Sequence, residues 1–375
     1  MLRGLFWLSA GALAWTHAGY PLAAAALARR RPRPVRKGSA TPLVTVVVAA
    51  HDEEDVIERR LENLLALDYP ADRLEVVVVS DGSRDATDEL VEAVAARDPR
   101  VRLLRRERGG KTAAQDAAVA AGRGEIVAFS DANSTWAPDA LRMLVRSFAD
   151  PDVGYVCGRL ELERPDGTSR EPVYWRYELW LRESESRLAG VTAGNGAIYA
   201  VRREDYREID PRLGHDLGFP YLMKQHGRRP VYEPDALAFE KAPADSDDEF
   251  GRRVRMHAQG WLHLLSGRML RPAEPLYLAQ LVSHRVLRYA SGLLHAALLG
   301  SSVALAGRSP AARAALAAQL AWLGLAAAGR LRVPLPGAML AYHYLVVTAA
   351  TVVGLARCLE GRVPSVWDKA AGTRD

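Results

Sequence analysis

Between Pro42 and about Leu160, short apolar runs alternate with segments in which apolar residues recur at helical spacing. The apolar runs are 43–50, 74–80, 101–104 and 126–130, and the helical segments are 55–67, 88–96 and 112–121. Runs of this length that are rich in Val, Leu and Ile are typical of buried strands. The alternation therefore predicts an α/β fold with a parallel sheet and helices on both faces. Ligands bind where strands end in such sheets, so we expect the loops after the strands to carry the site.

Both ends of the chain are apolar and differ from the charged middle. Residues 4–28 are long enough to cross about 30 Å of hydrocarbon as a helix, and a cluster of six basic residues follows within residues 29–37. Positive charge favours the cytoplasmic side, so the next domain is predicted to lie in the cytoplasm. A cleaved signal peptide is the alternative, because residues 23–28 include small side chains that suit a signal peptidase. The proline-interrupted run 31–36 suits a short stiff linker.

After Arg271 the chain becomes amphipathic and then apolar. Residues 276–289, with His284, Arg285 and Arg288 on one side, suit an interfacial helix. Membrane spans are predicted at about 291–306, 311–328 and 335–356. Three spans would place the C-terminus outside, whereas the basic residues of the last 19 positions of the chain (Arg357, Arg362, Lys369 and Arg374) favour the inside. Either one apolar segment does not cross the membrane, or charge does not decide the position of this tail.

These patterns divide the chain into six parts. They are an N-terminal transmembrane helix (1–28), a basic linker (29–41), a cytoplasmic α/β domain (42–270), an interfacial helix (271–290), C-terminal transmembrane helices (291–357) and a basic tail (358–375). The net charge of +5 comes largely from arginines beside the apolar segments, which indicates attraction to a membrane surface and not to nucleic acid. Cys157 and Cys358 lie far apart without metal-ligand spacing, so neither a disulfide framework nor a zinc site is expected.

The ends of the predicted strands carry polar and charged residues. Asp52 follows the first strand, Asp81 the second, and Lys111 comes after two glycines beyond the third. Acidic groups at neighbouring strand ends can accept hydrogen bonds from a nucleoside, and a Gly-Gly-Lys turn lets an ammonium approach a phosphate. Asp131 and Asn133 place two oxygen ligands on the loop after the fourth strand, a set that Mg²⁺ or Mn²⁺ can share with a diphosphate. Ordinary helix starts, a turn and an Asx cap are the alternative interpretations.

Three runs of sequence together resemble the inverting family 2 glycosyltransferases of the cellulose-synthase and hyaluronan-synthase type. They are VTVVVAAHDEED, VVVVSDGSRDAT and GGKTAAQDAAVAAGRGEIVAFSDAN, and the resemblance covers about Pro42 to Trp261. It implies a GT-A fold, a nucleotide-sugar donor and a divalent metal on the donor's diphosphate. It also implies that Asp52, Asp81 and Lys111 contact the nucleotide and that Asp131 and Asn133 form the Asp-x-Asp position. Asn133 departs from that pattern, and the loss of one charge is expected to weaken metal binding.

The second half of the domain supplies candidates for the chemistry. Gly194, Asn195 and Gly196 resemble the family's glycine-containing stretch near donor sugar and acceptor, and His215 and Asp216 occupy the place of its acidic pair. Inversion at an anomeric carbon needs a base for the acceptor hydroxyl, and Asp216 is the candidate. Its alternative role is to cap a helix. His215 replaces the usual acid, so it is expected at most to tune Asp216 electrostatically.

A third cluster, residues 249–261, resembles the family's QxxRW signature. Arg252 stands at the Gln position, Arg255 at the Arg position and Met256 at the Trp position. Guanidinium groups suit a departing nucleoside diphosphate, so Arg252 and Arg255 are the candidates for diphosphate binding. A basic helix that touches lipid phosphates is the alternative.

The sequence thus predicts a membrane-bound inverting hexosyltransferase with a GT-A domain. It would move a hexose or N-acetylhexosamine from a nucleotide-sugar, most plausibly a UDP-sugar, to a lipid-linked or growing glycan acceptor. Membrane lipids are expected partners, nucleic acid is not, and the oligomeric state is not indicated. Transfer to a polyprenyl phosphate, or a catalytically silent scaffold for glycan assembly, are the alternatives.

Overall fold

The computed structural model describes residues 1–163, 173–241, 246–271 and 274–363, and these residues form two compact units. The first, called the α/β unit here, contains residues 24–241 and 267–278 within those ranges. The second, called the helical unit, contains residues 1–23, 246–266 and 279–363. Each unit is described by itself.

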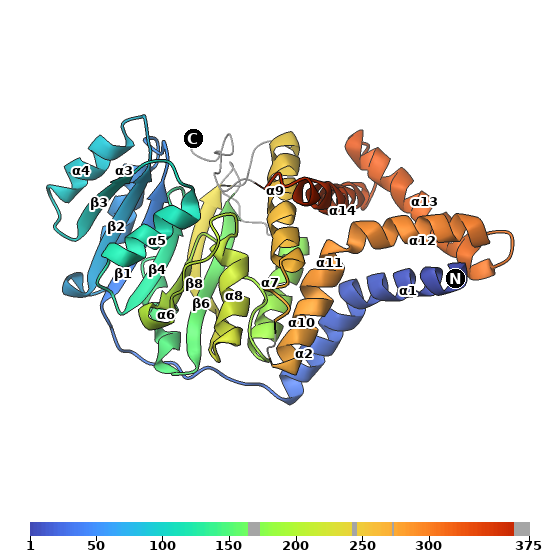
Figure 1. The fold of residues 1–375 in the computed structure, drawn as a ribbon, viewed down its shortest axis with the longest axis horizontal. Helices are drawn as coiled ribbons and strands as arrows, with labels where there is room; N and C mark the ends of the chain where they lie inside the picture. The colour runs from blue at the N-terminus through green and yellow to red at the C-terminus, as the bar shows by residue number, and fades with distance from the viewer. Residues whose placement is uncertain (164–172, 242–245, 272–273, 364–375) are drawn as a thin grey trace. The chain divides into compact units, whose positions relative to one another are not determined.

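The α/β unit is built on one mixed sheet. Its strands in the described residues are β1 (Val44–Ala50), β2 (Leu74–Asp81), β3 (Val101–Arg106), β4 (Ile126–Asp131), β5 (Thr135–Trp136), β6 (Val153–Glu163), β7 (Tyr199–Arg202) and β8 (Arg229–Lys241). They lie in the order β3-β2-β1-β4-β7-β6-β8-β5, and Figure 1 labels β1 to β4, β6 and β8. The first four in this order pair in parallel, as the sequence predicts. Beyond β4 the sheet is mixed, because β7 runs antiparallel to both β4 and β6, while β8 is parallel to β6.

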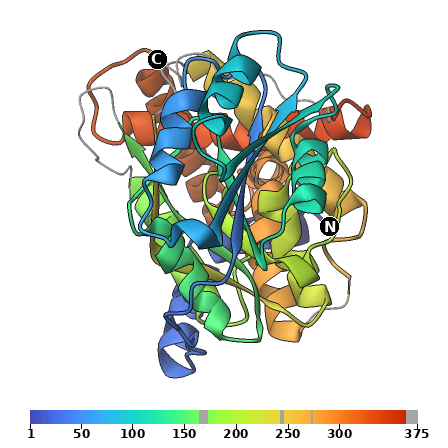
Figure 2. The same cartoon turned by 90° about the vertical axis from the view of Figure 1, so that its left-hand side faces the viewer.

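Helices cover both faces of this sheet (Figure 2). The strands β1 and β2 are buried along their whole length. One face packs against α3 (Ile57–Leu65), α4 (Thr87–Ala95) and α6 (Ala140–Arg146). The other packs against α5 (Lys111–Ala121), α7 (Val173–Ser186) and α8 (His215–Gln225). Short 3₁₀ turns occupy Ala71–Arg73, Ser147–Ala149 and Arg203–Asp205. Continuous apolar strands such as VTVVVAA are what burial on two faces requires, and this explains why the first strands were readable from sequence.

The topology brings several loops to one edge of the sheet. Strands β1, β2, β4, β6 and β8 run in the same direction, so their carboxyl ends meet at this edge, called the site edge here. Because β7 is antiparallel, the segment that precedes it enters at the same edge. The loops that carry Asp52, Asp131 and Gly194–Gly196 are therefore neighbours in space although they are far apart in sequence.

The helical unit contains the N-terminal helix, α9 (Ser246–Leu265) and the C-terminal helices. The N-terminal helix consists of α1 (Leu2–Ala14), a π-helical segment (Trp15–Gly19) and α2 (Tyr20–Arg30), of which residues 24–30 belong to the α/β unit. The long C-terminal helices are α12 (Ser291–Leu305), α13 (Pro310–Arg330) and α14 (Ala338–Leu359). Phe6 and Leu13 of α1 pack against Leu298 and Leu305 of α12. The Trp261 indole on α9 donates to the carbonyl of Thr351 on α14 at 2.8 Å.

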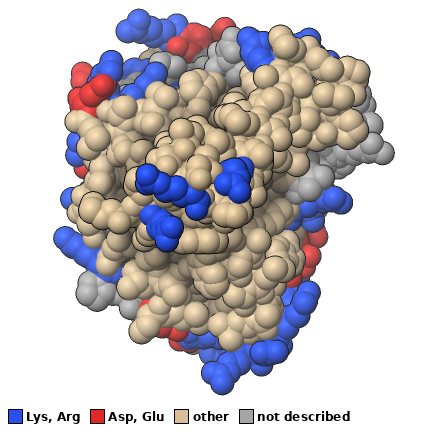
Figure 3. Space-filling view, turned by 90° about the vertical axis from the view of Figure 1, so that its right-hand side faces the viewer, with Lys and Arg blue, Asp and Glu red and all other residues tan. Residues whose placement is uncertain are grey.

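Two helices of this unit, α13 and α14, are long and apolar enough to cross a membrane, which agrees with two of the predicted spans. The third predicted span, α12, has 15 residues and is shorter. Figure 3 views the side on which α12 and α13 lie and shows a surface with few charged side chains, most of them Lys or Arg. Length, composition and this surface together suggest membrane association.

The segment predicted as one interfacial helix, 276–289, is divided in the structure. It consists of α10 (Pro275–Gln280), a second π-helical segment (Leu281–Val286) and α11 (Leu287–Tyr289). His284 is buried, so it does not share an exposed polar side with Arg285 and Arg288 as the sequence suggested. The two π-helical segments contact each other within the helical unit: Thr16 Oγ1 donates to the carbonyl of Ser283 at 2.8 Å, and Trp15 Nε1 donates to Ser283 Oγ at 3.0 Å.

Candidate active site

Lys111 and Asp131 form an ion pair at the centre of the site edge. Lys111 is the first residue of α5, and Gly110 before it has a φ of 96°, a conformation that a residue with a side chain rarely adopts. Asp131 is the last residue of β4. Burial lowers the pKa of Lys111, but Asp131, Asp216 and Glu240 raise it, and the net pKa lies above the ordinary value. The ammonium therefore stays charged beside a group of carboxylates.

Asp81 holds the turn that precedes Lys111. Its buried carboxylate accepts hydrogen bonds from the backbone N–H groups of Gly109 at 2.7 Å and Gly110 at 2.9 Å. These bonds fix the turn that presents Lys111 to the site edge. Asp81 thus has a structural task that its sequence motif did not reveal, next to the predicted contact with the nucleoside, which stays a prediction.

Asp52 joins the loops after β1 and β2. Its φ is 51°, its backbone N–H donates to Ser83 Oγ at 3.1 Å, and its Oδ1 accepts from the backbone N–H of Arg84 at 2.7 Å. The neighbouring His51 contacts the carbonyl of Asp81 through Nδ1 at 2.9 Å. The two acidic residues predicted to hold a nucleoside therefore lie on loops that are bonded to each other.

The loop Gly194–Gly196 lies against the Lys111–Asp131 pair. A Cβ on Gly196 would lie 3.2 Å from Asp131 Oδ2 and 3.3 Å from Lys111 Nζ, so only glycine brings the backbone this close without crowding. The backbone N–H of Gly194 donates to the carbonyl of Asp216 at 2.7 Å. The loop therefore connects the pair to the start of α8.

The side chain of Asn195 fixes this loop to the sheet. Its Nδ2 donates to the carbonyl of Gly158 at 2.8 Å, and its Oδ1 accepts from the backbone N–H of Ile198 at 2.9 Å. Both hydrogen bonds are buried. Asn195 therefore shapes the loop from within and does not present its amide to a ligand.

Asp216 lies in the first turn of α8, two residues after the N-cap Gly214, and its carboxylate accepts hydrogen bonds from the backbone N–H groups of Leu217 and of Asp216 itself. Burial raises the pKa of its carboxyl group, Lys111 opposes this shift, and Asp131 adds to it. The carboxylate is thus close enough to Lys111 and Asp131 to interact with both. A partly buried carboxylate with a raised pKa is better suited to take up a proton than an exposed one.

His215 points away from this group into an aromatic cluster. It is buried, its Nδ1 lies 2.9 Å from Tyr199 Oη, and Gln115 Nε2 donates to that hydroxyl at 3.2 Å. The rings of Phe129 and Phe219 pack edge-on against it. Burial lowers the pKa of His215 to about 3, so the ring is neutral at physiological pH. It contributes packing beneath Asp216 and no charge.

Two charged residues near the site were not predicted from the sequence. Ser134 Oγ donates to Glu240 Oε1 on β8 at 2.5 Å, and Glu240 raises the pKa of Lys111. Arg60 on α3 is buried, donates to Ser130 Oγ at 2.7 Å, and lies over the Trp136 ring at 4.9 Å. Burial lowers the pKa of Arg60 to about 9. Neither residue lies in a recognisable motif, and contacts between elements that are distant in sequence bring them to Asp131.

Much of the α/β unit matches a known protein family. Residues 45–210 match the family described as "Glycosyl transferase family 2". The chain contains a family 2 glycosyltransferase domain. This domain includes Asp52, Asp81, Lys111 and Asp131. The predicted family resemblance and the GT-A fold are both confirmed.

Relatives of this glycosyltransferase domain act on different molecules according to their names. A "Beta-monoglucosyldiacylglycerol synthase" from Synechocystis sp. is 34% identical over 40% of this chain and 33% of its own length. An "N-acetylglucosaminyltransferase" from Rhizobium meliloti is 31% identical over 54% of this chain and 52% of its own length. The chain thus spans between a third and about half of these curated relatives.

A solved structure matches nearly the whole chain. It is the mannosyltransferase PcManGT from Pyrobaculum calidifontis, in complex with GDP-Man and Mn²⁺. It aligns with a TM-score of 0.75 and 26% identity over 96% of this chain and 100% of its own. The aligned region therefore includes most of the glycosyltransferase domain and most of the additional helices.

The donor set of the domain fits a divalent metal that is shared with a substrate. No group of three or more His, Cys, Asp or Glu side chains in the described part of the chain is placed to hold a metal by itself. Mg²⁺ commonly binds to one or two protein oxygens together with substrate phosphates and waters. Asp131 offers a carboxylate and Asn133 an amide oxygen on the same loop, and the Asn133 side chain makes no hydrogen bond to a described residue.

The predicted diphosphate ligands, Arg252 and Arg255, lie on α9 and belong to the helical unit. Arg252 Nη1 lies 3.3 Å from Met256 Sδ one turn later. Met256 is 47% exposed, so it does not pack in the core of its unit. The role of both arginines stays a prediction.

Proposed function

We propose that the protein transfers a hexose or N-acetylhexosamine, with inversion, from a nucleoside-diphosphate sugar to an acceptor at the membrane. The observation that carries this proposal is the meeting of three features at the site edge. These are the Lys111–Asp131 pair, the glycine loop that lies against it, and Asp216 at the start of α8. The family of the domain and the names of its relatives support the same reaction class.

The reaction is a single displacement. The acceptor hydroxyl oxygen forms a bond to the anomeric carbon while the bond from that carbon to the diphosphate oxygen breaks, which inverts the configuration. Asp216 takes the proton of the hydroxyl, and its raised pKa strengthens it as a base. Asp216 then returns the proton to solvent.

The leaving group is a nucleoside diphosphate, which develops negative charge as the bond breaks. Lys111 stays protonated and lies at the site edge, where it can stabilise that charge. A Mg²⁺ or Mn²⁺ ion held by Asp131 and Asn133 would add Lewis-acid stabilisation of the diphosphate. We assign the nucleoside to the loops of Asp52 and Asp81. Arg252 and Arg255 are proposed as further diphosphate ligands.

The acceptor is proposed to be a lipid-linked or growing glycan. Two helices that are able to cross a membrane, α13 and α14, keep the chain at such a surface, and one relative is named for a diacylglycerol lipid product. The basic residues after the N-terminal helix favour a cytoplasmic position for the domain, where nucleotide-sugars are made. Labelling of a single cysteine introduced in the domain, in intact and in lysed cells, tests this side.

The decisive experiment is a screen for nucleoside-diphosphate release by detergent-purified full-length protein. UDP-sugars are the first choice, and GDP-sugars belong in the panel because the solved relative holds GDP-Man. We expect one donor to be cleaved in the presence of Mn²⁺, and the variant Asp216→Asn to lose that activity. Absence of both binding and cleavage for every donor would overturn the proposed function.

A further inference from the structure

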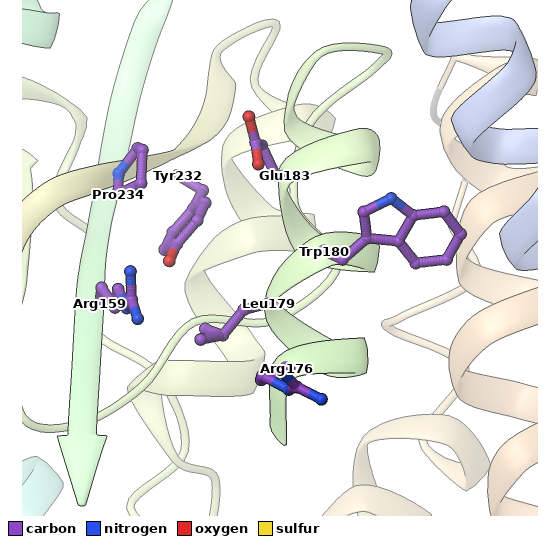
Figure 4. A pocket seen from close by; sticks show the side chains of 7 residues that line it. All are labelled: Arg159, Arg176, Leu179, Trp180, Glu183, Tyr232 and Pro234. Atoms are coloured by element: carbon purple, nitrogen blue, oxygen red, sulfur yellow. The ribbon is translucent and has the colours of Figure 1, made fainter. Parts of the chain in front are cut away.

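A pocket of about 200 Å³ lies between β6, β8 and α7 in the α/β unit. Its walls combine charged, aromatic and apolar side chains: Arg159, Arg176, Leu179, Trp180, Glu183, Tyr232 and Pro234. In Figure 4, Arg159 from the strand and Leu179 from the helix point toward each other, Tyr232 and Glu183 lie beyond them, and the Trp180 indole points away from the strands. None of these residues is among the predicted catalytic, nucleotide-binding, diphosphate-binding or metal-binding residues.

The strand register indicates how far this pocket lies from Asp131. Phe129 pairs with Tyr199, and Tyr199 pairs with Cys157, so Asp131 and Arg159 each lie two residues beyond the same row. Phe129 and Cys157 both pack on the sheet face that α5, α7 and α8 cover. Asp131 follows Phe129 by two residues, and Arg159 lines the pocket with Leu179 and Tyr232 of that same face, so Asp131 and Arg159 belong to one face although the pairing of β6 with β8 shifts between Cys157 and Arg159. Two strand spacings separate them, which is about 10 Å.

The order of the strands places the pocket and the proposed nucleoside loops on opposite sides of Asp131. The loops assigned to the nucleoside follow β1 and β2, Asp131 ends β4, and the pocket begins two strands further on, at β6. In an inverting displacement the acceptor attacks from the side opposite the leaving diphosphate. Since the nucleotide lies toward β2, the acceptor must approach from the side of β7 and β6. The pocket is lined by residues of β6, β8 and α7, so it lies on that side of Asp131 in the strand order.

Hydrogen bonds connect the walls of the pocket to the loop Gly194–Gly196, which lies against the Lys111–Asp131 pair. Asn195 Nδ2 donates to the carbonyl of Gly158, the residue before Arg159, at 2.8 Å. Arg182 on α7 donates from Nη2 to the carbonyl of Gly194 at 3.4 Å, and its guanidinium lies over the Tyr232 ring at 5.7 Å. Movement of either wall of the pocket is therefore coupled to the loop Gly194–Gly196.

We propose that this pocket is a subsite for a sugar unit of the acceptor, one ring beyond the unit that is attacked. The inference rests on the proposed function and names the substrate contact that lies farther from the reacting carbon. The volume of the pocket is below the range of about 300–1,000 Å³ that is typical of pockets for drug-sized ligands, and it suits a single sugar ring.

The chemistry of the walls fits a neutral sugar with several hydroxyl groups. Arg159 is paired with Glu161 at 3.1 Å, and Glu183 is paired with Arg187 at 2.7 Å, so most of the charge on the walls is already balanced. Guanidinium groups offer donors and the carboxylate offers acceptors to hydroxyl groups, while Leu179 and Pro234 offer apolar surface to ring carbons. An anionic lipid headgroup would meet Glu183 in the same space.

The test compares one-ring and two-ring acceptors on the full-length protein in detergent. The probes are methyl glycosides of glucose, mannose and N-acetylglucosamine and the corresponding disaccharides, used with the donor that the screen identifies. Arg159→Gln and Glu183→Gln change side chains that are partly exposed, so both variants should fold. Arg73→Gln is the matched control, because Arg73 is exposed and precedes β2 at the opposite edge of the sheet.

We expect the disaccharide to have a lower apparent KM than the monosaccharide. Each pocket variant should raise the disaccharide KM at least tenfold and leave the monosaccharide KM, the slow cleavage of donor by water and the Arg73→Gln control within about twofold of wild type. Variants that change both acceptors equally, or neither, would overturn the subsite.

Calorimetric titration of the same disaccharides in the presence of the nucleoside diphosphate adds a measurement that needs no turnover. Tenfold weaker binding to Arg159→Gln and Glu183→Gln supports the subsite. No binding to wild type, or equal binding to wild type and variants, overturns it. Failure of the proposed function would look different, because no donor would be bound or cleaved even without an acceptor.

Discussion

The substitution Asp216→Asn separates a catalytic role of this carboxylate from a structural one. Asparagine has nearly the same shape, so the change removes the charge and the basic oxygen and little else. Asp216 lies in the first turn of α8, where an acid contributes about 0.3–1 kcal/mol through the helix dipole, and the Oδ1 atom of asparagine can still accept the backbone hydrogen bonds that the carboxylate accepts. Burial raises its pKa, which means that the charge is partly disfavoured in the folded protein and the loss is at the low end. We expect the melting temperature to fall by no more than about 4 °C.

Turnover should respond far more strongly than stability. General-base catalysis contributes about 10² to 10⁴ in rate, or roughly 3–5 kcal/mol of activation free energy. Asp216→Asn should therefore lower kcat at least about a hundredfold, and the Kd of the donor should remain near that of wild type, because the base acts on the acceptor. Asp81→Ala should weaken donor binding first, because its predicted partner is the nucleoside in ground and transition states alike.

The pH profile adds a signature that a structural role would not produce. A base works only when it is deprotonated, so wild-type kcat/KM should fall as the pH drops through the pKa of Asp216, and the burial-raised pKa places this fall at a higher pH than for an ordinary aspartate. In Asp216→Asn this limb should be absent from the residual rate.

The assay is nucleoside-diphosphate release together with thermal unfolding on one sample. Asp139→Asn is the matched control, since Asp139 is an exposed acid at the start of α6 and makes no capping bond. A near-normal kcat with a lowered melting temperature in Asp216→Asn would remove Asp216 from the mechanism.

Three further predictions follow from the described contacts. Asn133→Asp should lower the Mn²⁺ concentration needed for half-maximal activity, because a second charge strengthens the ligand set, and an unchanged titration curve would speak against metal binding there. Gly196→Ala should lower kcat/KM at least about tenfold without unfolding the protein, because its Cβ would lie 3.2 Å from Asp131 Oδ2 and crowd the ion pair; wild-type kinetics would contradict this. Asp116 accepts a hydrogen bond from Tyr206 Oη, and burial raises its pKa to about 6. The protonated Asp116 carboxyl group therefore contributes its full stabilisation below the ordinary pKa of 3.8, and this stabilisation is lost as the pH rises through about 6. Asp116→Asn should accordingly be more stable than wild type at pH 7–8 by up to about 3 kcal/mol, with the gain absent at pH 4 in thermal melts; a gain that does not depend on pH would refute this assignment.

The sequence pattern was sufficient for the first half of the sheet. The strands predicted at 74–80 and 126–130 are found at Leu74–Asp81 and Ile126–Asp131, because a strand buried on both faces must be continuously apolar and leaves a local signal. The position of Asp52, Asp81 and Asp131 at one edge followed from the parallel order of these strands. Local composition was enough for these strands because each is a continuous apolar run and all of them are parallel.

The second half could not be predicted in the same way. Tyr199–Arg202 enters the sheet antiparallel between β4 and β6, and this pairing depends on contacts between residues about 70 positions apart. Glu240 and Arg60 reach the site by the same long-range order and lie in no motif. His215 stands in a motif but points into an aromatic cluster, and a side-chain direction is decided by packing that the sequence does not display. The sequence motifs indicated which loops carry the site, and tertiary contacts decide which side chains of those loops point into it.

The paired π-helical segments at Trp15–Gly19 and Leu281–Val286 bear on how relatives should be aligned. A π-helical turn holds one more residue than the α-helical turn it replaces, and each residue of an α-helix turns the chain by about 100°. Each segment therefore absorbs one inserted residue without rotating the helix on either side. Because Thr16 and Trp15 of one segment bond to Ser283 of the other, the two insertions depend on each other. An alignment of full-length relatives should accordingly show single-residue gaps at both places in the same proteins, and a gap at one place alone should be accompanied by a change of Thr16 or Ser283.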